Sequence, residues 1–320
     1  MSLPDHHPFP FDPTYGLNEA ALRTVAGPEE ADGFDAFWQA RYARARAVAA
    51  DPVVSKPVPS AGPWIVSDIR FTSTDDQTIG GWLLLPRDGK VKRGLIVGHG
   101  YGGRDAPDLD LPVRETAVLF TCFRGLSRSR TKPIPDEASG HVLYGIDDRD
   151  HYVIGGCVED LWVSVSALTA LFPGIGSRIG YSGISFGGGI GALALPYDDR
   201  IDRGFLEVPT FGNRPLWLSL PTIGSANAVQ AYAATHPEVA ETLRIFDAAI
   251  AARRLDKPML VAAARFDPAV APPCQFSVAN ALPKRRHHEI FILDAGHFEY
   301  PGEAAQKRVL REKVGRLFDT

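Results

Sequence analysis

The sequence predicts an α/β fold with a mostly parallel, doubly wound sheet and helices on both faces. Short apolar runs without a helical period alternate with segments long enough for helices of about 10–15 residues, a rhythm typical of βαβ units. A glycine-rich stretch, residues 181–189, joins one of these runs to an apolar segment of helical length. This alternation implies right-handed βαβ crossovers and a mostly parallel sheet. Residues 1–320 are expected to form one domain, as α/β folds of this size often do.

The first part of the chain, about residues 1–60, is expected to be an irregular proline-rich arm followed by a helix over residues 32–50. The aromatic residues of that helix recur at helical spacing, which predicts core packing rather than a ligand site. They are Phe34, Phe37, Trp38 and Tyr42. Residues 65–85 alternate between apolar and polar on either side of a turn at 75–77, so we expect strands there.

The other strands are expected at six apolar runs, and a helix over about residues 304–318 closes the chain. The runs cover residues 95–97, 118–123, 179–181, 205–208, 258–264 and 289–293. Helical pieces between about residues 210 and 251 interrupt the alternation. We therefore expect this segment to form a cap or lid over the functional site.

The stretch 181–189 contains the pattern Gly183-Ile184-Ser185-Phe186-Gly187 between a short strand and a helix expected over residues 188–195. Strand, sharp turn and helix in this order predict a nucleophile elbow, the hallmark of the α/β-hydrolase fold. Such a turn exposes the serine Oγ at a helix N-terminus, where a developing negative charge is favoured. A glycine-rich turn with an incidental serine is the alternative, and the flanking strand and helix disfavour it.

A serine nucleophile needs a base and an orienting acid, which follow in the order Ser, Asp or Glu, His in this fold. Asp267 comes just after the run 258–264, and His297 follows the run 289–293. We therefore assign Ser185, Asp267 and His297 as the catalytic residues. Asp294 also lies at a strand end, but only three residues before His297, and it is better suited to capping that loop.

The glycine-rich loop after residues 95–97 is the candidate oxyanion loop. It resembles the His-Gly loop that supplies one backbone N–H, the other coming from the residue after the nucleophile. The expected donors are the amides of Tyr101 and Phe186, whose side-chain identity does not matter for this role. His99, in the same loop, is expected to be structural.

The remaining histidines suggest no second site. His6 and His7 are expected in a terminal tail, and His287 and His288 in a solvated turn beside basic residues. Neither an H-E-x-x-H motif nor paired cysteines occur, so we expect no metal and no other cofactor.

Composition limits the kinds of partner and the cellular compartment that we expect for this protein. The formal net charge of −4 provides no basic surface for nucleic acid. The polar, proline-rich N-terminus resembles no signal peptide, and no long apolar run predicts a membrane span. The odd and widely spaced Cys122, Cys157 and Cys274 favour reduced thiols, and hence a cytoplasmic protein.

Several segments resemble the acetyl xylan esterases and cephalosporin C deacetylases of carbohydrate esterase family 7, and the likeness runs through most of the chain. They are Phe34-Asp35-Ala36-Phe37-Trp38, the stretch 79–86, Gly100-Tyr101-Gly102-Gly103, Thr235-His236-Pro237, and Phe266-Asp267 with Pro272-Pro273. The resemblance implies an α/β-hydrolase that removes acetyl groups from small acetylated sugars and related esters, with the same three catalytic residues. It also implies a homo-oligomer, commonly a hexamer.

The chain departs from the family signature at three positions. The family has Arg-Gly-Gln, Gly-x-Ser-Gln-Gly and His-Glu, whereas Leu126, Phe186 and Phe298 stand here in place of the two glutamines and the glutamate. We expect these changes to weaken hydrogen bonding to a sugar and to favour less polar alcohols.

The predicted function is a serine carboxylesterase that acts on small acetyl or other short-acyl esters, with no membrane or nucleic-acid partner. Two alternatives remain open. One is another small-molecule hydrolase of the same fold, similar to dienelactone hydrolases or peptidases. The other is a hydrolase-fold binding protein without catalysis, which the ordered Ser, Asp and His disfavour.

Overall fold

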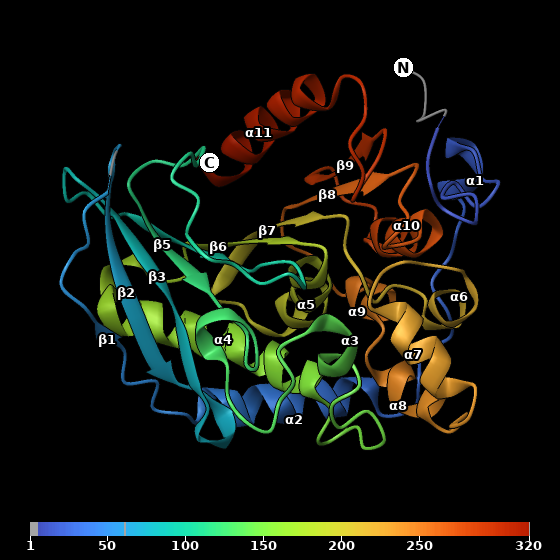
Figure 1. The fold of residues 1–320 in the computed structure, drawn as a ribbon. Coiled ribbons are helices and arrows are strands. Elements are labelled where there is room, and N and C mark those ends of the chain that lie inside the picture. Colours follow the sequence, from blue (N-terminus) through green and yellow to red (C-terminus); the bar gives the residue numbers. More distant parts are fainter. Residues whose placement is uncertain (1–5, 61, 320) are drawn as a thin grey trace.

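The computed structural model describes residues 6–60 and 62–319, and in these residues nine strands form a single sheet (Figure 1). Its strand order is β1-β2-β3-β5-β4-β6-β7-β8-β9. The strands are β1 (Val53–Val54), β2 (Trp64–Thr72), β3 (Thr78–Pro86), β4 (Arg93–Val97), β5 (Thr116–Thr121), β6 (Ile179–Ile184), β7 (Ile201–Glu207), β8 (Met259–Ala264) and β9 (His288–Leu293). From β5 to β9 all neighbours are parallel, whereas β1, β2 and β3 add an antiparallel edge. The predicted mostly parallel sheet is confirmed.

Helices cover both faces of the sheet, as the doubly wound prediction requires. On one face α2 (Phe34–Arg46), α4 (Val153–Leu171) and α5 (Phe186–Ala194) enclose the larger hydrophobic core. On the other face α11 (Glu303–Asp319), red in Figure 1, buries Leu310, Val314 and Phe318 against the strands. The aromatic residues of α2 pack into or against the larger core, as predicted.

Element boundaries differ from the predictions where backbone geometry or pairing overrides the apolar pattern. Helix α2 starts only after Gly33, whose left-handed φ of 75° marks its N-terminus. Strand β5 lies two residues earlier than the run 118–123. Strand β7 already begins at Ile201, because its polar first residues pair with β6, and it ends where Val208 adopts a φ of 41°. Helix α5 starts at Phe186, directly after Ser185.

Helix α4 is the longest of the elements that the sequence analysis did not locate. By length and composition it is the one helix in the described part of the chain that could cross a membrane, yet 83% of its most apolar stretch is buried. It also carries Glu159 and Asp160, both fully buried. Because such acids need partners inside a protein, we interpret α4 as a core helix.

The segment between β7 and β8 contains four short helices. They are α6 (Arg214–Ser219), α7 (Ala226–Ala233), α8 (Val239–Ile245) and α9 (Ala248–Ala252). Together with α10 (Pro272–Ala281), which follows β8, they lie near the carboxyl ends of the parallel strands (Figure 1). In parallel sheets of this kind, ligands bind at that end.

Candidate active site

Ser185 occupies the sharp turn between β6 and α5. Its backbone is strained, with a φ of 54° and a ψ of −111°, a conformation that only a well-supported turn maintains. Two glycines permit it: a Cβ on Gly183 would lie 2.5 Å from the Gly187 carbonyl oxygen, and one on Gly187 would lie 2.9 Å from that of His99. The Ser185 amide also donates to the Glu207 carbonyl at 2.8 Å. The turn therefore holds the serine side chain clear of its own backbone.

The structure brings the three predicted side chains together, although they come from distant parts of the sequence. His297 Nε2 lies 2.9 Å from Ser185 Oγ, and His297 Nδ1 lies 2.8 Å from Asp267 Oδ2. A carboxylate only accepts hydrogen bonds, so Nδ1 carries the hydrogen and Nε2 is free to accept from the serine hydroxyl. This is the geometry that general-base activation of a serine requires.

Asp267 is fully buried and its carboxylate is held from several sides. Oδ1 accepts from the amides of Ala269 at 2.8 Å and Val270 at 2.9 Å, while Oδ2 also accepts from Gln275 Nε2 at 2.8 Å. Such hydrogen bonds stabilise an ionised carboxylate and fix its direction. Gln275 lies on α10, and no sequence signal pointed to it.

Asp294 has a different partner from the one predicted. Its carboxylate forms an ion pair with Arg265 instead of capping the loop, and its own amide donates to Gln306 Oε1 at 3.0 Å. The expected loop cap is therefore wrong. Arg265, two residues before Asp267, pairs with the Asp294 side chain. Among the described residues, no hydrogen bond joins Asp294 to His297.

The His297 ring is partly buried, with 26% of its side chain exposed. Burial lowers the pKa of His297, but the charge of Asp267 and the hydrogen bond to it raise the pKa more, so the net shift is upward. A base with a raised pKa accepts a proton more readily.

The two expected oxyanion donors both lie beside Ser185. Tyr101 lines the cavity that contains Ser185 and His297, and Phe186 begins α5. In the described part of the chain neither amide has a hydrogen-bond acceptor. Both are therefore available to a ligand, and the positive end of the α5 dipole adds to their attraction for an anion.

His99 has the structural position that the sequence suggested. Its Nδ1 lies 2.7 Å from the Gly100 carbonyl oxygen, and its Nε2 accepts from the Phe123 amide at 3.1 Å. Burial lowers the pKa of His99 to about 4. With both nitrogens bound to backbone groups, the ring ties the oxyanion loop to the loop after β5.

A second histidine, which the sequence analysis did not single out, supports Tyr101. His141 Nε2 lies 2.9 Å from the Arg124 carbonyl oxygen, so Nδ1 is the acceptor for the Tyr101 hydroxyl at 3.2 Å. The Tyr101 ring also stacks on Phe186 with centroids 4.2 Å apart. Tyr101 is thus held by both its hydroxyl and its ring.

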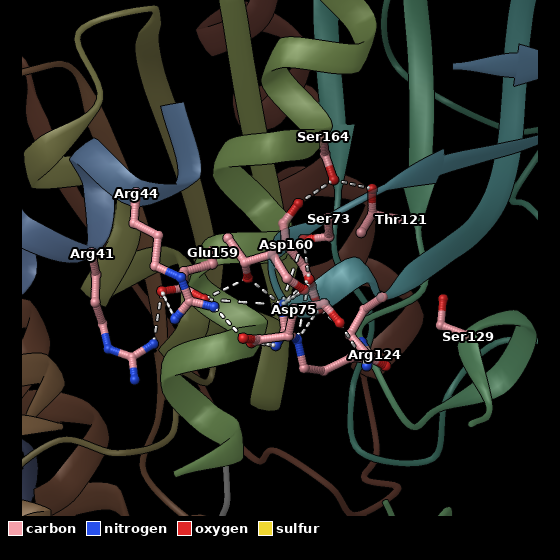
Figure 2. Close-up of polar contacts among 12 residues, drawn as sticks. Arg41, Arg44, Ser73, Asp75, Thr121, Arg124, Ser129, Glu159, Asp160 and Ser164 are labelled. Atoms are coloured by element: carbon pink, nitrogen blue, oxygen red, sulfur yellow. Dashed lines mark hydrogen bonds and ion pairs between the residues drawn. The ribbon is translucent and has the colours of Figure 1, made fainter. Parts of the chain in front are cut away.

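The loop that provides the Arg124 carbonyl is itself anchored by a buried charge network (Figure 2). The Arg124 guanidinium, 6% exposed, contacts Asp160 at 2.7 Å and Asp75 at 3.1 Å, and Arg41 contacts Glu159 at 2.8 Å. Glu159 and Asp160 are the buried acids of α4. The network joins α2, α4 and the β2–β3 turn to the loop behind Tyr101.

Of the three departures from the family signature, two have side chains that are buried and line neither cavity beside the candidate site. Leu126 and Phe186 are 1% and 0% exposed and pack in the core. Phe298 instead packs against Phe266, with centroids 5.3 Å apart, and against Phe9 at 5.6 Å. A direct effect on the substrate is therefore expected from Phe298 alone.

Two cavities meet at His297 and Ile184. One, of about 370 Å³, contains Ser185 and is mostly apolar. Its walls come from the oxyanion loop, from α6, and from the segments after β7 and β8, including Tyr101, Thr210, Trp217, Ile223 and Val270. The other, of about 670 Å³, is more polar and includes Glu207, Glu299, Tyr300, Glu303 and Lys307. The predicted cap segment thus contributes walls to the first cavity.

No group of metal-ligating side chains occurs in residues 6–60 and 62–319. Cys122, Cys157 and Cys274 are all buried and unpaired, in agreement with the expected reduced thiols.

The sheet has a strained serine directly after a central parallel strand, and this serine faces a histidine from the loop after the last strand. These features define the α/β-hydrolase class. The family model of acetyl xylan esterase (AXE1) matches residues 19–313, and the chain belongs to this family. Membership places it among the carboxylic ester hydrolases and confirms the resemblance seen in the sequence.

Solved structures agree on the fold. An acetyl xylan esterase from Paenibacillus sp. R4 superposes with a TM-score of 0.80 at 21% identity, covering 93% of this chain and 99% of that one. Acetyl xylan esterase 1 from Thermoanaerobacterium sp. JW/SL YS485 gives 0.79 at 19% identity, with coverages of 95% and 99%. A Pyrococcus furiosus esterase is more distant, with a TM-score of 0.55 at 20% identity and coverages of 83% and 96%.

Proposed function

We propose that this protein is a serine acetyl esterase that removes acetyl or other short acyl groups from small esters. The observation that carries the proposal is the hydrogen-bonded chain from Ser185 through His297 to Asp267, with distances of 2.9 and 2.8 Å. The names of the two acetyl xylan esterases that share the fold support acetylated sugars as substrates. Cephalosporin-type esters are the second substrate class that the family resemblance suggests.

Acylation starts when Ser185 Oγ attacks the ester carbonyl carbon and His297 Nε2 takes its proton. The negative charge that develops on the carbonyl oxygen is stabilised by the amides of Tyr101 and Phe186. Asp267 holds the His297 ring in the required tautomer and stabilises the imidazolium. His297 then gives the proton to the leaving alcohol, and the acyl group remains on Ser185.

Deacylation repeats the same steps with water in place of the serine hydroxyl. His297 takes a proton from water, the resulting tetrahedral intermediate is held by the same two amides, and the acid leaves as Ser185 regains its proton. The apolar cavity of about 370 Å³ beside Ser185 accommodates the acyl group. The more polar cavity beyond His297 accommodates the alcohol.

We also expect the enzyme to act in the cytoplasm as a homo-oligomer. The three buried, unpaired cysteines support a reducing compartment. Light scattering during size-exclusion chromatography measures the oligomer.

The test is the change Ser185→Ala with 4-nitrophenyl acetate as substrate. Because the nucleophile is lost, kcat should fall at least about 10³-fold with an unchanged melting temperature. Ser182→Ala, three residues earlier on β6, is the matched control and should keep its activity. A fluorophosphonate probe should label the peptide that contains Ser185. A Ser185→Ala enzyme with more than about a tenth of the normal rate would refute the proposal.

A further inference from the structure

The N-terminal arm, residues 6–18, crosses the loops that carry Asp267 and His297. It precedes the part of the chain that matches the family, which starts at residue 19. The buried Pro13 accepts a hydrogen bond from the Asp267 amide at 3.1 Å. The arm thus contacts the backbone of the residue that orients the histidine.

An aromatic cluster joins the arm to the loop of His297. Phe9 lies edge-on to Phe298 with centroids 5.6 Å apart, and Phe298 lies 5.3 Å from Phe266. His7 adds an edge contact to Phe266 at 5.4 Å. Phe298 stands where the family signature has glutamate, and its aromatic side chain has its partners on the arm and on the Asp267 loop. Aromatic pairs in such geometry stabilise a contact beyond simple burial.

The arm has a defined conformation of its own. The Asp12 carboxylate accepts from the amides of Thr14 at 2.8 Å and Gly16 at 3.1 Å. The Tyr15 hydroxyl donates to the Pro221 carbonyl at 2.7 Å, two residues before Ile223 in the wall of the Ser185 cavity. The arm therefore contacts three segments, and each of them contributes to the candidate site.

The loop that carries His297 has no backbone hydrogen bond from His297 onward until Tyr300 within the described chain. His297 itself has a left-handed φ of 47°. The position of the ring therefore depends on its own two hydrogen bonds, on the packing of Phe298 and on the hydrogen bond from the Gly296 amide to the Phe266 carbonyl at 2.8 Å. A small displacement of a catalytic side chain is costly, because its hydrogen bonds need a narrow range of distance and angle.

We propose that the N-terminal arm is a positioning element for the base and its acid: Phe9 fixes the His297 loop through Phe298, and Pro13 fixes the Asp267 loop. The proposal rests on the proposed roles of Ser185, Asp267 and His297. Phe9 contacts no reacting atom, so it acts on the rate only through the His297 ring.

The test compares Phe9→Ala and Phe9→Leu with Phe11→Ala, a change of the same kind on the arm. Phe11 contacts Phe9 and Tyr15 but not Phe298. Phe9→Ala should lower kcat about tenfold with KM unchanged, because binding is intact and the base is misplaced. Phe9→Leu should restore most of the rate, and Phe11→Ala should leave it near normal. The acid limb of the pH profile of kcat/KM should move to lower pH in Phe9→Ala. The contact between His297 and Asp267 is then looser, so Asp267 raises the pKa of His297 less than in the unaltered enzyme.

A second experiment removes the arm and returns it as a separate molecule. An enzyme without residues 2–18 should regain kcat in a saturable way when a synthetic peptide of residues 6–18 is added, and a peptide with alanine in place of Phe9 should not restore it. A lower melting temperature with unchanged kcat in Phe9→Ala would overturn the positioning role. These outcomes are separate from the proposed esterase activity, which the unaltered enzyme must show first.

Discussion

Asp267 and Asp294 both follow parallel strands, yet their side chains have different surroundings. The Asp267 carboxylate accepts from two amides, Gln275 and His297, whereas Asp294 pairs with Arg265. A carboxylate paired with arginine and without a hydrogen bond to His297 in the described chain does not orient the base. The difference predicts which of the two aspartates the reaction depends on.

Asp267→Asn should lower kcat by about 10³- to 10⁴-fold, because the amide no longer holds the required His297 tautomer. Asp294→Asn, an equally conservative change, should cost far less. In the unaltered enzyme, kcat/KM should fall as the pH drops through a His297 pKa above 6.5. Asp267→Asn should move this limb to lower pH, because the two larger causes that raise the pKa come from Asp267, with the charge of Glu207 adding less. The opposite ranking of the two variants would assign the acid to Asp294.

The hydroxyl of Tyr101 provides a second test, which removes a single oxygen atom. Tyr101→Phe keeps the backbone amide and the stacking on Phe186 but removes the hydroxyl that donates to His141. Because the loop then loses one of its restraints, kcat should fall about three- to tenfold with KM unchanged. Tyr144→Phe, the same change nearby, is the control. Equal rates for all three enzymes would show that the hydroxyl does not position the oxyanion loop.

Helix α6 places the wall of the acyl cavity. Trp217 lines that cavity, and the buried Arg214 guanidinium lies over its ring at 4.5 Å and over Phe211 at 4.4 Å. Phe211 also lies edge-on to the indole with centroids 6.2 Å apart, so the guanidinium and the phenyl ring together restrict the Trp217 side chain. The wall therefore limits the length of the acyl group more strictly than the volume of about 370 Å³ suggests.

Acetate esters should be preferred over butyrate esters at least about tenfold in kcat/KM, and octanoate should hardly react, because extra methylenes meet a rigid wall. Trp217→Ala should reduce or reverse the preference for acetate. Leu218→Ala, on the same helix but outside the cavity lining, should leave it unchanged. The measurement is kcat/KM for 4-nitrophenyl acetate, butyrate and octanoate. A preference for octanoate in the unaltered enzyme would contradict a short acyl cavity.

At the scale of the whole molecule, two buried histidines should set the acid limit of stability. Burial lowers the pKa of both His99 and His141 to about 4, from an ordinary value of 6.5. Between these values the unfolded chain binds more protons than the folded one, so the free energy of unfolding falls as the pH drops. Each ring contributes a loss on the order of 3 kcal/mol by about pH 4. His297 acts in the opposite direction, because its pKa is raised.

Urea unfolding at several pH values between about 7.5 and 4.5 measures this effect. The unfolding free energy should decline below about pH 6.5 with a net uptake of about one to two protons. His141→Gln should flatten the decline, whereas His151→Gln, at a side chain 79% exposed, should not. A flat profile in the unaltered protein would contradict the buried, neutral state of the two rings.

The sequence determined the class of fold and the positions of the three central side chains along the chain. Apolar runs without a helical period indicate strands that are buried on both faces. The pattern around Ser185 combines a turn, two indispensable glycines and the start of a helix. These are local properties, so they can be read from neighbouring residues. Ser185, Asp267 and His297 can meet because each follows a parallel strand and the carboxyl ends of these strands lie at one edge of the sheet. Their catalytic roles stay predictions.

Only the tertiary structure decided which distant side chains meet. Gln275 and His141 had no local signal, because Gln275 meets Asp267 eight residues away and His141 meets Tyr101 40 residues away. The prediction for Asp294 was wrong because its ion pair with Arg265 joins the ends of two neighbouring strands, and a pattern within one loop cannot show such a contact. From the sequence, Phe298 was interpreted only as the loss of a polar side chain. The structure shows that it packs against Phe9 of the arm. Packing between segments that are remote in sequence is a property of the folded chain, and a one-dimensional pattern does not contain it.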